Sequence, residues 1–252
     1  MSEHINISNS NGILTLVMNR PDKKNALTND MYGALADALE GSDHDPSVRV
    51  IVIRGEGEIF TAGNDVGEFA AGGAGPRHVT RFIRALATIA KPLVAAVQGK
   101  AVGVGTTMLL HCDHVVLAEN AELIAPFVNL ALVPEAASSL LLPSRIGHVR
   151  AFAMFALGEP IGAEDAVTWG LANKVVATDD LVATATEFAE RLARQPLGAL
   201  IATKKLMRAT NTITAHMDVE SEQFAARLTS PEAQEAFLAF AQRRQPDFRQ
   251  FA

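Results

Sequence analysis

The stretch PLVAAVQGKAVGVGTTMLLHCD, Pro92 to Asp113, contains an apolar run, a group of glycines and a second apolar run in close succession. The first run, PLVAAVQG, is apolar enough to be a strand buried on both faces, as is typical of a parallel sheet. Gly99, Gly103 and Gly105 then predict a tight turn that opens a helix, whose first amides lack an intrahelical partner. Such a helix start favours an anion or a developing oxyanion. Tight turns and close packing alone would explain the same glycines.

Strands and helices alternate on both sides of this stretch. Upstream, INIS, NGILTLVMN and VRVIVIRG are predicted strands, and the first two form a hairpin that turns near Asn11-Gly12. Between the second and third strands lies LTNDMYGALADALEG, a helix with Thr28 as its predicted N-cap and Gly41 as its predicted stop. Downstream, HVVLAE and AELIAP are predicted strands of a second, parallel unit. This alternation predicts an α/β fold.

Two regions depart from the alternation. The segment AAGGAGP, Ala70 to Pro76, is predicted to be a surface loop before the helix RHVTRFIRALATIAK. From Asp179 onward, nearly every segment has helical periodicity, as in DDLVATATEFAERLARQ and PEAQEAFLAFAQRR. We therefore predict a core domain over residues 1–195 and a helical C-terminal region over residues 196–252.

The composition excludes several classes of protein. The chain has 252 residues, 48% hydrophobic and 20% charged, so it can bury the core of one large domain. Its net charge of −6 argues against a general nucleic-acid surface. The start, MSEHINIS, has neither a basic nor an apolar stretch, so no signal peptide is expected. Pro126, Pro134 and Pro143 interrupt the apolar segment of residues 123–144, so no membrane span is predicted. The single Cys112 excludes an intrachain disulfide and fits a reducing compartment, so we expect a cytoplasmic protein.

A second glycine turn lies in IFTAGNDVGEF. Ala62 and Gly63 let the backbone turn tightly there, which can leave the amide of Asn64 pointing outward. Neither turn is a nucleotide motif, because GKAVGVG lacks both the Lys-Ser/Thr ending of a phosphate loop and the third glycine of a dinucleotide fingerprint. For either turn alone, a purely structural role explains the residues at least as well as an oxyanion site does.

Four segments, in this order, resemble the successive signatures of the crotonase, or enoyl-CoA hydratase/isomerase, family. They are NRPDKKNAL (Asn19 to Leu27), FTAGNDV (Phe60 to Val66), KPLVAAVQGKAVGVGTTMLLHCD (Lys91 to Asp113) and AEDAVTWGLANKVV (Ala163 to Val176). The resemblance covers nearly the whole chain. It implies a crotonase-like spiral of strand-strand-helix units, a helical C-terminal region used for oligomerisation, and assembly into homotrimers or dimers of trimers.

The resemblance also implies a substrate. Members of this family bind an acyl-CoA thioester whose carbonyl oxygen lies between two backbone amides. By motif position, those amides belong to Asn64 and Val104. The family often has glycine at the second position; a valine supplies the same N–H, but its side chain would narrow the pocket. Because coenzyme A is part of the substrate, no separate cofactor is expected.

The hydratases of the family use two glutamates that this chain lacks. At the positions that the resemblance assigns to them stand Thr107 and Phe127. Adding water to a conjugated double bond requires a group that activates the water and delivers a proton. Neither a threonine hydroxyl nor a phenyl ring does this near neutral pH. Hydratase chemistry is therefore not expected.

Glu135 is the one formal charge in NLALVPEAASSLLL, Asn129 to Leu142. An acid just after Pro134 is explained locally as a first-turn residue that complements a helix dipole. The segment PFVNLALVPEAASS, however, resembles the 3-enoyl-CoA to 2-enoyl-CoA isomerases of the family, whose single catalytic glutamate occupies the Pro-Glu position. That reaction needs one base, and apolar neighbours raise the pKa of a carboxyl group by desolvation. We expect Glu135 to be this base.

Other polar residues near the motifs have structural interpretations. Asp65 is expected to hold its loop by hydrogen bonds rather than to transfer protons. His111 and His114 flank Cys112 in LLHCDHVV. On a helix end and the following strand their side chains would diverge, so packing is the better interpretation and no metal site is predicted.

Coenzyme A requires cationic contacts in this acidic protein. Lys23 and Lys24 stand where the family places the nucleotide end of CoA, and Arg243 and Arg244 lie in a C-terminal segment that can reach its phosphates. A solvated basic surface explains these charges equally well. Main-chain contacts with the coenzyme are implied by family position at Ala26, Ala62, Asp65 and Gly103.

Three functions remain open from the sequence. The leading hypothesis is an acyl-CoA double-bond isomerase in which Glu135 removes and returns the proton. A second keeps the fold but makes Glu135 a nucleophile, or the base of a dienoyl isomerase, dehalogenase or hydrolase acting on a CoA thioester. A third is an inactive acyl-CoA-binding homologue. The sequence does not determine the length and branching of the acyl group.

Overall fold

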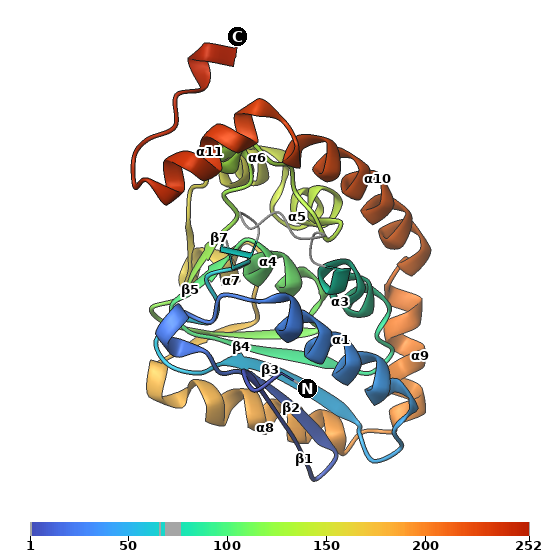
Figure 1. Ribbon diagram of the computed structural model, residues 1–252. Helices are drawn as coiled ribbons and strands as arrows, with labels where there is room; N and C mark the ends of the chain where they lie inside the picture. The colour runs from blue at the N-terminus through green and yellow to red at the C-terminus, as the bar shows by residue number, and fades with distance from the viewer. Residues whose placement is uncertain (1, 66, 69–76, 252) are drawn as a thin grey trace.

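The computed structural model describes residues 2–65, 67–68 and 77–251. Its main sheet has the strand order β1-β2-β3-β4-β6-β9 (Figure 1). Neighbouring strands in it are parallel, except for the antiparallel pair of β1 and β2. These strands are β1 (Ile5–Ser10), β2 (Ile13–Met18), β3 (Val50–Gly55), β4 (Leu93–Val97), β6 (His114–Ala118) and β9 (Lys174–Val176). The predicted α/β class is confirmed.

The first two strands form the predicted hairpin. Ser10 pairs with Ile13, and Asn11 and Gly12 between them have φ angles of 53° and 81°. Asn followed by Gly is the pair that adopts this left-handed turn at least cost. The turn therefore fixes the register in which β1 pairs with β2.

The central strands are buried on both faces, which is why their sequences are continuous apolar runs. In β3, Val50 and Val52 pack with α8 (Leu181–Ala193), whereas Ile51 and Ile53 belong to the main core on the opposite face. Helices α1 (Asn29–His44) and α3 (Arg77–Thr88) cover this opposite face (Figure 1). The sheet is thus enclosed between helices.

A smaller sheet has the strand order β5-β7-β8. Its strands are β5 (Lys100–Val102), β7 (Glu122–Ile124) and β8 (Ile161–Gly162). Strand β5 follows β4 along the chain, and β7 follows β6, so each of these pairs passes from the main sheet into the smaller one before the next helical segment. This path is the spiral of strand-strand-helix units that the resemblance implied.

The glycines of the opening stretch do not all begin a helix. Gly103 precedes α4 (Val104–Thr107) and Gly105 lies in it, but Gly99 belongs to the turn between β4 and β5. Residues Lys100 to Val102, between Gly99 and the helix, form strand β5, which pairs with β7 in the smaller sheet. Helix α4 is short and continues as the 3-10 helix η2 (Met108–His111). The predicted loop Ala70 to Pro76 lies outside the described residues.

Helix α1 has the predicted N-cap, since the Thr28 hydroxyl accepts from the amide of Met31, but it does not stop at Gly41. It continues to His44. The reason is Lys91, a buried side chain that donates to the carbonyl oxygens of Ser42 and Asp45, the latter at 2.6 Å. The helix end is therefore set by a tertiary contact rather than by a local glycine.

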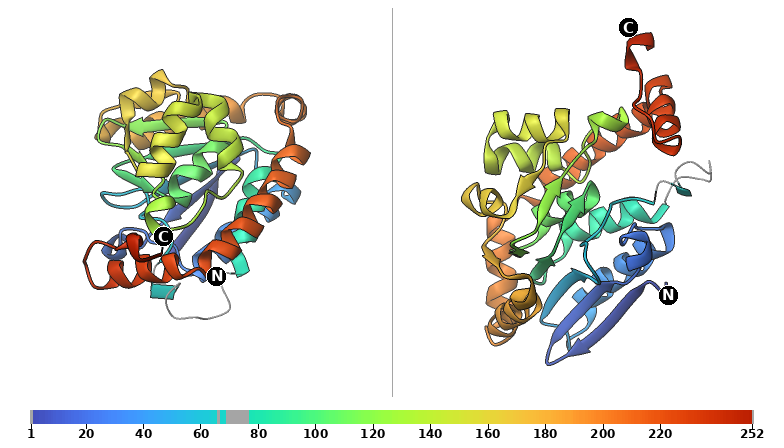
Figure 2. Two further views of the ribbon diagram at one scale, coloured as in Figure 1. Left: turned by 90° about the horizontal axis from the view of Figure 1, so that it is seen from above. Right: turned by 90° about the vertical axis from the view of Figure 1, so that its left-hand side faces the viewer.

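The C-terminal helices run along the side and top of this core. In Figures 1 and 2, α9 follows the edge of the sheet layer, and α10 then passes over α3 and α5. None of the helices in the described part of the chain has the length and apolar character of a membrane span. The division at residue 196 stays a prediction. The remaining helices are η1 (Pro21–Lys23), η3 (Val128–Leu130), α5 (Ser138–Ile146), α6 (His148–Leu157), α7 (Ala163–Thr168), η4 (Thr178–Asp180), α9 (Leu197–Met207), α10 (Thr210–Leu228), α11 (Pro231–Ala241) and η5 (Phe248–Phe251).

Candidate active site

Asn25 fastens the first motif of the chain to the end of β3. Its side chain is fully buried, and its amide donates to the carbonyl oxygens of Glu56 and Ile59, both at 2.8 Å. Its Oδ1 accepts from the amide of Arg20 at 2.8 Å. Because every group of this buried amide is used, the loop through η1 is held beside the first glycine turn.

The first glycine turn directs the N–H of Asn64 away from Leu27, its bridge partner. The Leu27 amide donates to Gly63 O at 2.8 Å, and Leu27 O accepts from the Asp65 amide at 3.0 Å. In this parallel bridge, the N–H of Asn64 itself points away from Leu27. Gly63 has a φ of 85°, and a Cβ there would lie 2.8 Å from Val102 O. The turn therefore requires glycine for both its conformation and its close approach to β5.

The second glycine turn leaves the N–H of the buried Val104 without an acceptor among the described residues. Gly103 has a φ of 56° and precedes Val104, the first residue of α4, whose N–H has no intrahelical acceptor. A Cβ at Gly105 would lie 2.5 Å from Thr61 Cγ2, so this glycine lets α4 pack directly against the first turn. Within the described residues, no main-chain hydrogen bond uses the N–H of Val104 or of Asn64.

Asn64, Val104 and Glu135 line one cavity of about 330 Å³. Glu135 is the one ionisable residue among the described residues of its lining. The C-terminal helices α10 and α11 close one side of the cavity with aromatic rings. Its large apolar side chains are Phe127, Leu130, Leu132, Phe224, Phe237 and Phe240. The arrangement places one acid and two main-chain donors in an apolar enclosure.

Glu135 lies in the loop before α5, so its interpretation as a first-turn residue of a helix is wrong. Its Oε1 accepts from the hydroxyl of Thr107 at 2.5 Å. Its Oε2 is buried and has no hydrogen-bond partner among the described residues. Burial raises the pKa of Glu135 to about 7, although the Thr107 hydrogen bond acts in the opposite direction. One carboxyl oxygen is thus held and the other is left to exchange a proton near neutral pH.

Replacing Thr107 by valine is expected to change the pH dependence of any reaction that uses Glu135 as its base. The hydroxyl stabilises the carboxylate, so its loss raises the pKa of Glu135 and moves the acid limb of the kcat/KM profile to higher pH. We expect activity near pH 6.5 to fall several-fold and activity near pH 9 to change little, because one hydrogen bond to a charged group contributes about 1.5–3 kcal/mol. Thr107→Ser retains the donor and is the control. An unchanged profile in Thr107→Val would contradict this assignment.

Tyr32 of α1 fixes the side chain of Asn64. The ring is buried, and its hydroxyl donates to Asn64 Oδ1. Burial, and then the nearby carboxylates of Glu135 and Glu68, raise the pKa of Tyr32 well above its ordinary value. The phenol therefore stays protonated and remains a donor. This bond supports the residue whose main-chain N–H lines the cavity.

The four cationic residues predicted to contact coenzyme A differ in whether another side chain already binds them. Lys23 and Lys24 are exposed beside η1, and Arg243 is exposed just beyond α11. Arg244 instead forms a bidentate ion pair with Glu235, at 2.5 and 2.8 Å, which lowers the pKa of Glu235 to about 2. A phosphate would have to compete with this carboxylate for Arg244.

The predicted main-chain contacts also divide into two groups. Ala62 and Gly103 line the cavity, but Ala26 and Asp65 are not among its described lining residues. The carbonyl of Ala26 accepts from Arg20 at 3.1 Å. Asp65 forms an ion pair with Arg20 at 2.6 Å, and this bond lowers the pKa of Asp65. Asp65 therefore holds the loop, in the way expected from the sequence.

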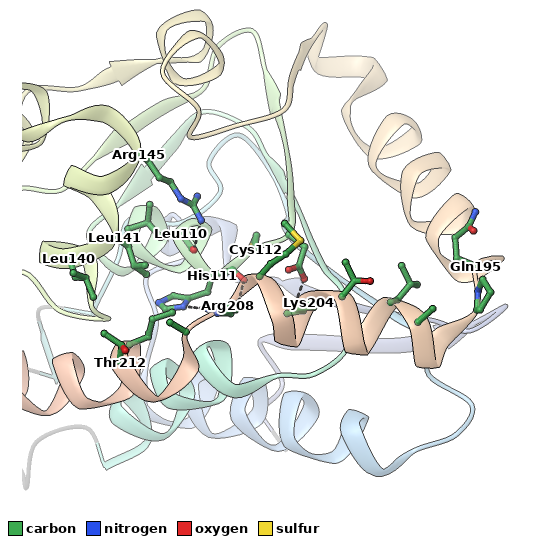
Figure 3. Close-up of a pocket in the computed structure, with 18 residues that line it drawn as sticks. Leu110, His111, Cys112, Leu140, Leu141, Arg145, Gln195, Lys204, Arg208 and Thr212 are labelled. Carbon is green, nitrogen blue, oxygen red and sulfur yellow. Dashed lines mark hydrogen bonds and ion pairs between the residues drawn. The ribbon is translucent and has the colours of Figure 1, made fainter.

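A larger cavity, of about 690 Å³, lies between α9 and the end of η2 (Figure 3). Arg145 and Arg208 lie on its wall and donate to the carbonyl oxygens of Leu110 and His111, at 2.7 and 3.2 Å. These are the last carbonyls of η2, where a cation satisfies the end of a helix. None of the residues predicted for the active site lines this cavity.

His111 and His114 contact different partners. Nδ1 of the buried His111 accepts from Arg208, so Nε2 carries the proton and donates to Ala136 O at 2.8 Å. Burial lowers the pKa of His111 to about 3, so the ring is neutral. His114 stacks on Phe188, with ring centroids 3.4 Å apart. Within the described residues, no group of three or more His, Cys, Asp or Glu side chains could hold a metal.

The residues that sequence reasoning missed come from the C-terminal helices. The i, i+3 spacing of Phe237 and Phe240 indicates an apolar helix face, but not the cavity that it covers. Glu220 of α10 holds the segment that follows Glu135. Nothing in the sequence distinguishes this acid from the exposed Glu222 of the same helix.

Comparison with known proteins gives a matching family model and relatives that are named for different reactions of CoA thioesters. The family model described as enoyl-CoA hydratase/isomerase matches residues 8–251. The chain is 35% identical over 254 residues to 2,3-dehydroadipyl-CoA hydratase of Escherichia coli (strain K12), with 99% of both chains covered. It is 33% identical over 248 residues to 1,2-epoxyphenylacetyl-CoA isomerase of the same organism, with 94% of this chain and 95% of the relative covered.

A solved structure has the same fold. The enoyl-CoA hydratase/isomerase from Pseudoalteromonas atlantica T6c superimposes with a TM-score of 0.93 and 41% sequence identity, over 98% of this chain and 100% of that one. The match to the family model, over residues 8–251, spans all four motifs. The chain therefore belongs to the enoyl-CoA hydratase/isomerase, or crotonase, family.

Proposed function

We propose that the protein is an acyl-CoA double-bond isomerase that converts a 3-enoyl-CoA into the corresponding 2-enoyl-CoA. The observation that carries the proposal is Glu135, the one acid in the described lining of an apolar cavity that Asn64 and Val104 also line. Among the described residues, its Oε2 has no hydrogen-bond partner, and no main-chain bond uses the N–H of Asn64 or Val104. The relatives are named for both isomerase and hydratase reactions of CoA thioesters. Family membership therefore supports the class of substrate, and the acid supports the reaction.

In the proposed reaction, the two amides bind the thioester oxygen. Oε2 of Glu135 removes a proton from C2, and the electron pair of that bond spreads to C4 and the thioester oxygen as a dienolate. The carboxyl group returns the proton at C4, which leaves the double bond between C2 and C3. The two N–H groups stabilise the negative oxygen, and one such donor is worth about 3–4 kcal/mol. The apolar walls keep water from protonating the carbanion.

The side chains at the two hydratase positions favour isomerisation over hydration. By the family resemblance, these positions are occupied by Thr107 and Phe127. Thr107 donates to Glu135, and Phe127 is 7% exposed and packs against Phe155, with ring centroids 6.0 Å apart. Neither side chain can activate a water molecule near neutral pH. A single base suffices for a proton shift but not for the addition of water.

Incubation of the purified protein with 3-hexenoyl-CoA tests the proposal. Conjugation of the double bond with the thioester raises the ultraviolet absorbance, and we expect this rise without subsequent hydration. Binding of the thioester without turnover would identify an inactive homologue instead. An acyl group trapped covalently on Glu135 would make this side chain a nucleophile. Either result would exclude the isomerase.

The acyl group is expected to be uncharged at its far end. Apart from Glu135, the described lining of the cavity offers no charged side chain, and its walls are aromatic and aliphatic. A terminal carboxylate would be buried without a cation, at a cost of several kcal/mol. We expect kcat/KM to be at least about 100-fold lower for the six-carbon 3-enoyl-CoA with a terminal carboxylate than for 3-hexenoyl-CoA. Equal values for this matched pair would contradict the expectation.

Coenzyme A is the one coenzyme in the proposal, and it arrives as part of the substrate. We propose Lys23, Lys24 and Arg243 as the exposed cations that meet its phosphates. Arg244 would first have to leave Glu235. Assembly into homotrimers or dimers of trimers likewise stays a prediction.

A further inference from the structure

Glu220 of α10 binds the segment that directly follows Glu135. Its side chain is 6% exposed. Its Oε2 accepts from the amide of Ala137 at 2.5 Å, and its Oε1 accepts from the amide and the hydroxyl of Ser139, at 2.9 and 2.5 Å. Hydrogen bonds to a carboxylate are roughly twice as strong as those between neutral groups. Glu220 therefore links α10 firmly to the loop that carries Glu135.

These bonds supply a cap that α5 lacks in its own sequence. The helix begins at Ser138, and its N-cap residue, Ala137, makes no side-chain cap bond. The first amides of a helix need acceptors from elsewhere, and a carboxylate at this end also complements the helix dipole. Glu220 does from a distant helix what an aspartate or serine N-cap does locally.

The capped segment is conformationally strained. Ala136 and Ala137 have φ angles of 60° and 55°. This left-handed conformation costs an L-residue roughly 1–2 kcal/mol. They are the two residues after Glu135, so relaxation of either one would move its carboxyl group. The Ala137 amide donates to Glu220, and His111 donates to the carbonyl oxygen of Ala136; both bonds oppose this relaxation.

The charge of Glu220 also acts on Glu135. It adds to the rise in the pKa of Glu135 that burial causes. In the described part of the chain, the other titratable groups near this pair are Tyr32 of α1, His111 of η2 and His216 of α10. The Nε2 of His216 lies 3.7 Å from Glu220 Oε1. The negative charge of Glu220 therefore makes Glu135 a stronger base.

We propose that Glu220 is a positioning residue: it holds the two left-handed alanines in place and thereby keeps the carboxyl group of Glu135 directed into the cavity. The inference rests on the proposed function only in taking Glu135 as the group that transfers the proton. Glu222 provides a matched comparison, because it is an exposed acid on the same helix.

Glu220→Gln tests the proposal, because it retains the size of the side chain but leaves one acceptor oxygen for two main-chain donors. We expect kcat for 3-hexenoyl-CoA to fall about 10- to 100-fold, since a displacement of about 1 Å can cost a factor of 100. KM should change less than about threefold, because the amides of the cavity are untouched. Loss of the charge lowers the pKa of Glu135, so the acid limb of the pH profile moves to lower pH. Glu222→Gln should have the kcat, the KM and the pH profile of the wild type.

A measurement without turnover separates this inference from the proposed function. In protein labelled with ¹³C at the glutamate side-chain carboxyl, the Glu135 signal is assigned by its loss in Glu135→Gln. Its titration should move to lower pH in Glu220→Gln and stay in place in Glu222→Gln. If the protein is inactive, or if Glu135→Gln remains active, the proposed function fails while this titration still tests the contact. A wild-type kcat in active Glu220→Gln, or an unmoved titration in an inactive protein, would overturn the inference.

Ser139→Ala provides the test if Glu220→Gln does not fold. It removes the hydroxyl that donates to Glu220 and leaves the carboxylate with its two main-chain donors. We expect a smaller loss, about three- to tenfold in kcat, at unchanged KM. A wild-type kcat in this variant would then overturn the proposal.

Discussion

Replacing Glu135 by glutamine is expected to lower kcat for the isomerisation of 3-hexenoyl-CoA by about 10³- to 10⁴-fold, at the upper end of what a positioned general base contributes. Glutamine has almost the same shape and can still accept from Thr107, but it cannot take up a proton. No other described residue of the cavity lining is ionisable, so no second acid substitutes for it. Steady-state kinetics with the conjugation assay measure the effect.

Loss of folding would not account for this result. The pKa of Glu135 is raised from 4.5 to about 7 in the folded protein, so the wild type loses stability as the pH rises between these values. A neutral glutamine avoids this loss, and Glu135→Gln should therefore be at least as stable as the wild type near pH 8. Binding of acetyl-CoA, measured by calorimetry, should be unchanged. A variant that retains more than about a tenth of the activity would show that another group is the base.

Val104→Pro is expected to reduce kcat/KM by about 100- to 1,000-fold, because it deletes one of the two N–H donors that we propose for the thioester oxygen. Val104 is the first residue of α4, where proline is favoured. The preceding Gly103 has φ 56° and ψ −116°, the mirror image of the extended conformation that residues before proline adopt. Glycine is achiral and tolerates this conformation. The helix should therefore form without the donor.

Val104→Ala is the matched control for this variant. It retains the N–H and shortens the side chain, so it should keep most of the activity. The comparison also tests whether the valine narrows the pocket, because a longer acyl chain would then be accepted better by the alanine variant. Equal activity of the proline variant and the wild type would mean that Val104 provides no oxyanion donor.

The parts of the fold that local chemistry controls could be predicted from the sequence. The hairpin at Asn11-Gly12 follows from the turn preference of two residues, and Thr28 caps α1 from within its own segment. The continuous apolar runs of the central strands predict burial on both faces. The Asn64 and Val104 amides were placed by motif position, and the structure brings both to the cavity that Glu135 lines.

The features that were missed depend on contacts between distant segments. The end of α1 is set by Lys91, so the local signal of Gly41 was misleading. The start of α5 is capped by Glu220, while the residue at its N-cap is an alanine with no capping group. Periodicity places such residues on a helix but does not identify the segment that the helix packs against.

The contact between Gly105 and Thr61 has a consequence for evolution. It leaves no room for even a methyl group, so packing fixes the spacing of the two glycine turns that we propose to bind the thioester. The acid, by contrast, comes from a separate loop. Mutation can therefore move or replace the acid, and so change which bond is broken, while the two glycine turns stay unchanged. A lineage that contains both an epoxide isomerase and a hydratase is what such independent inheritance would produce.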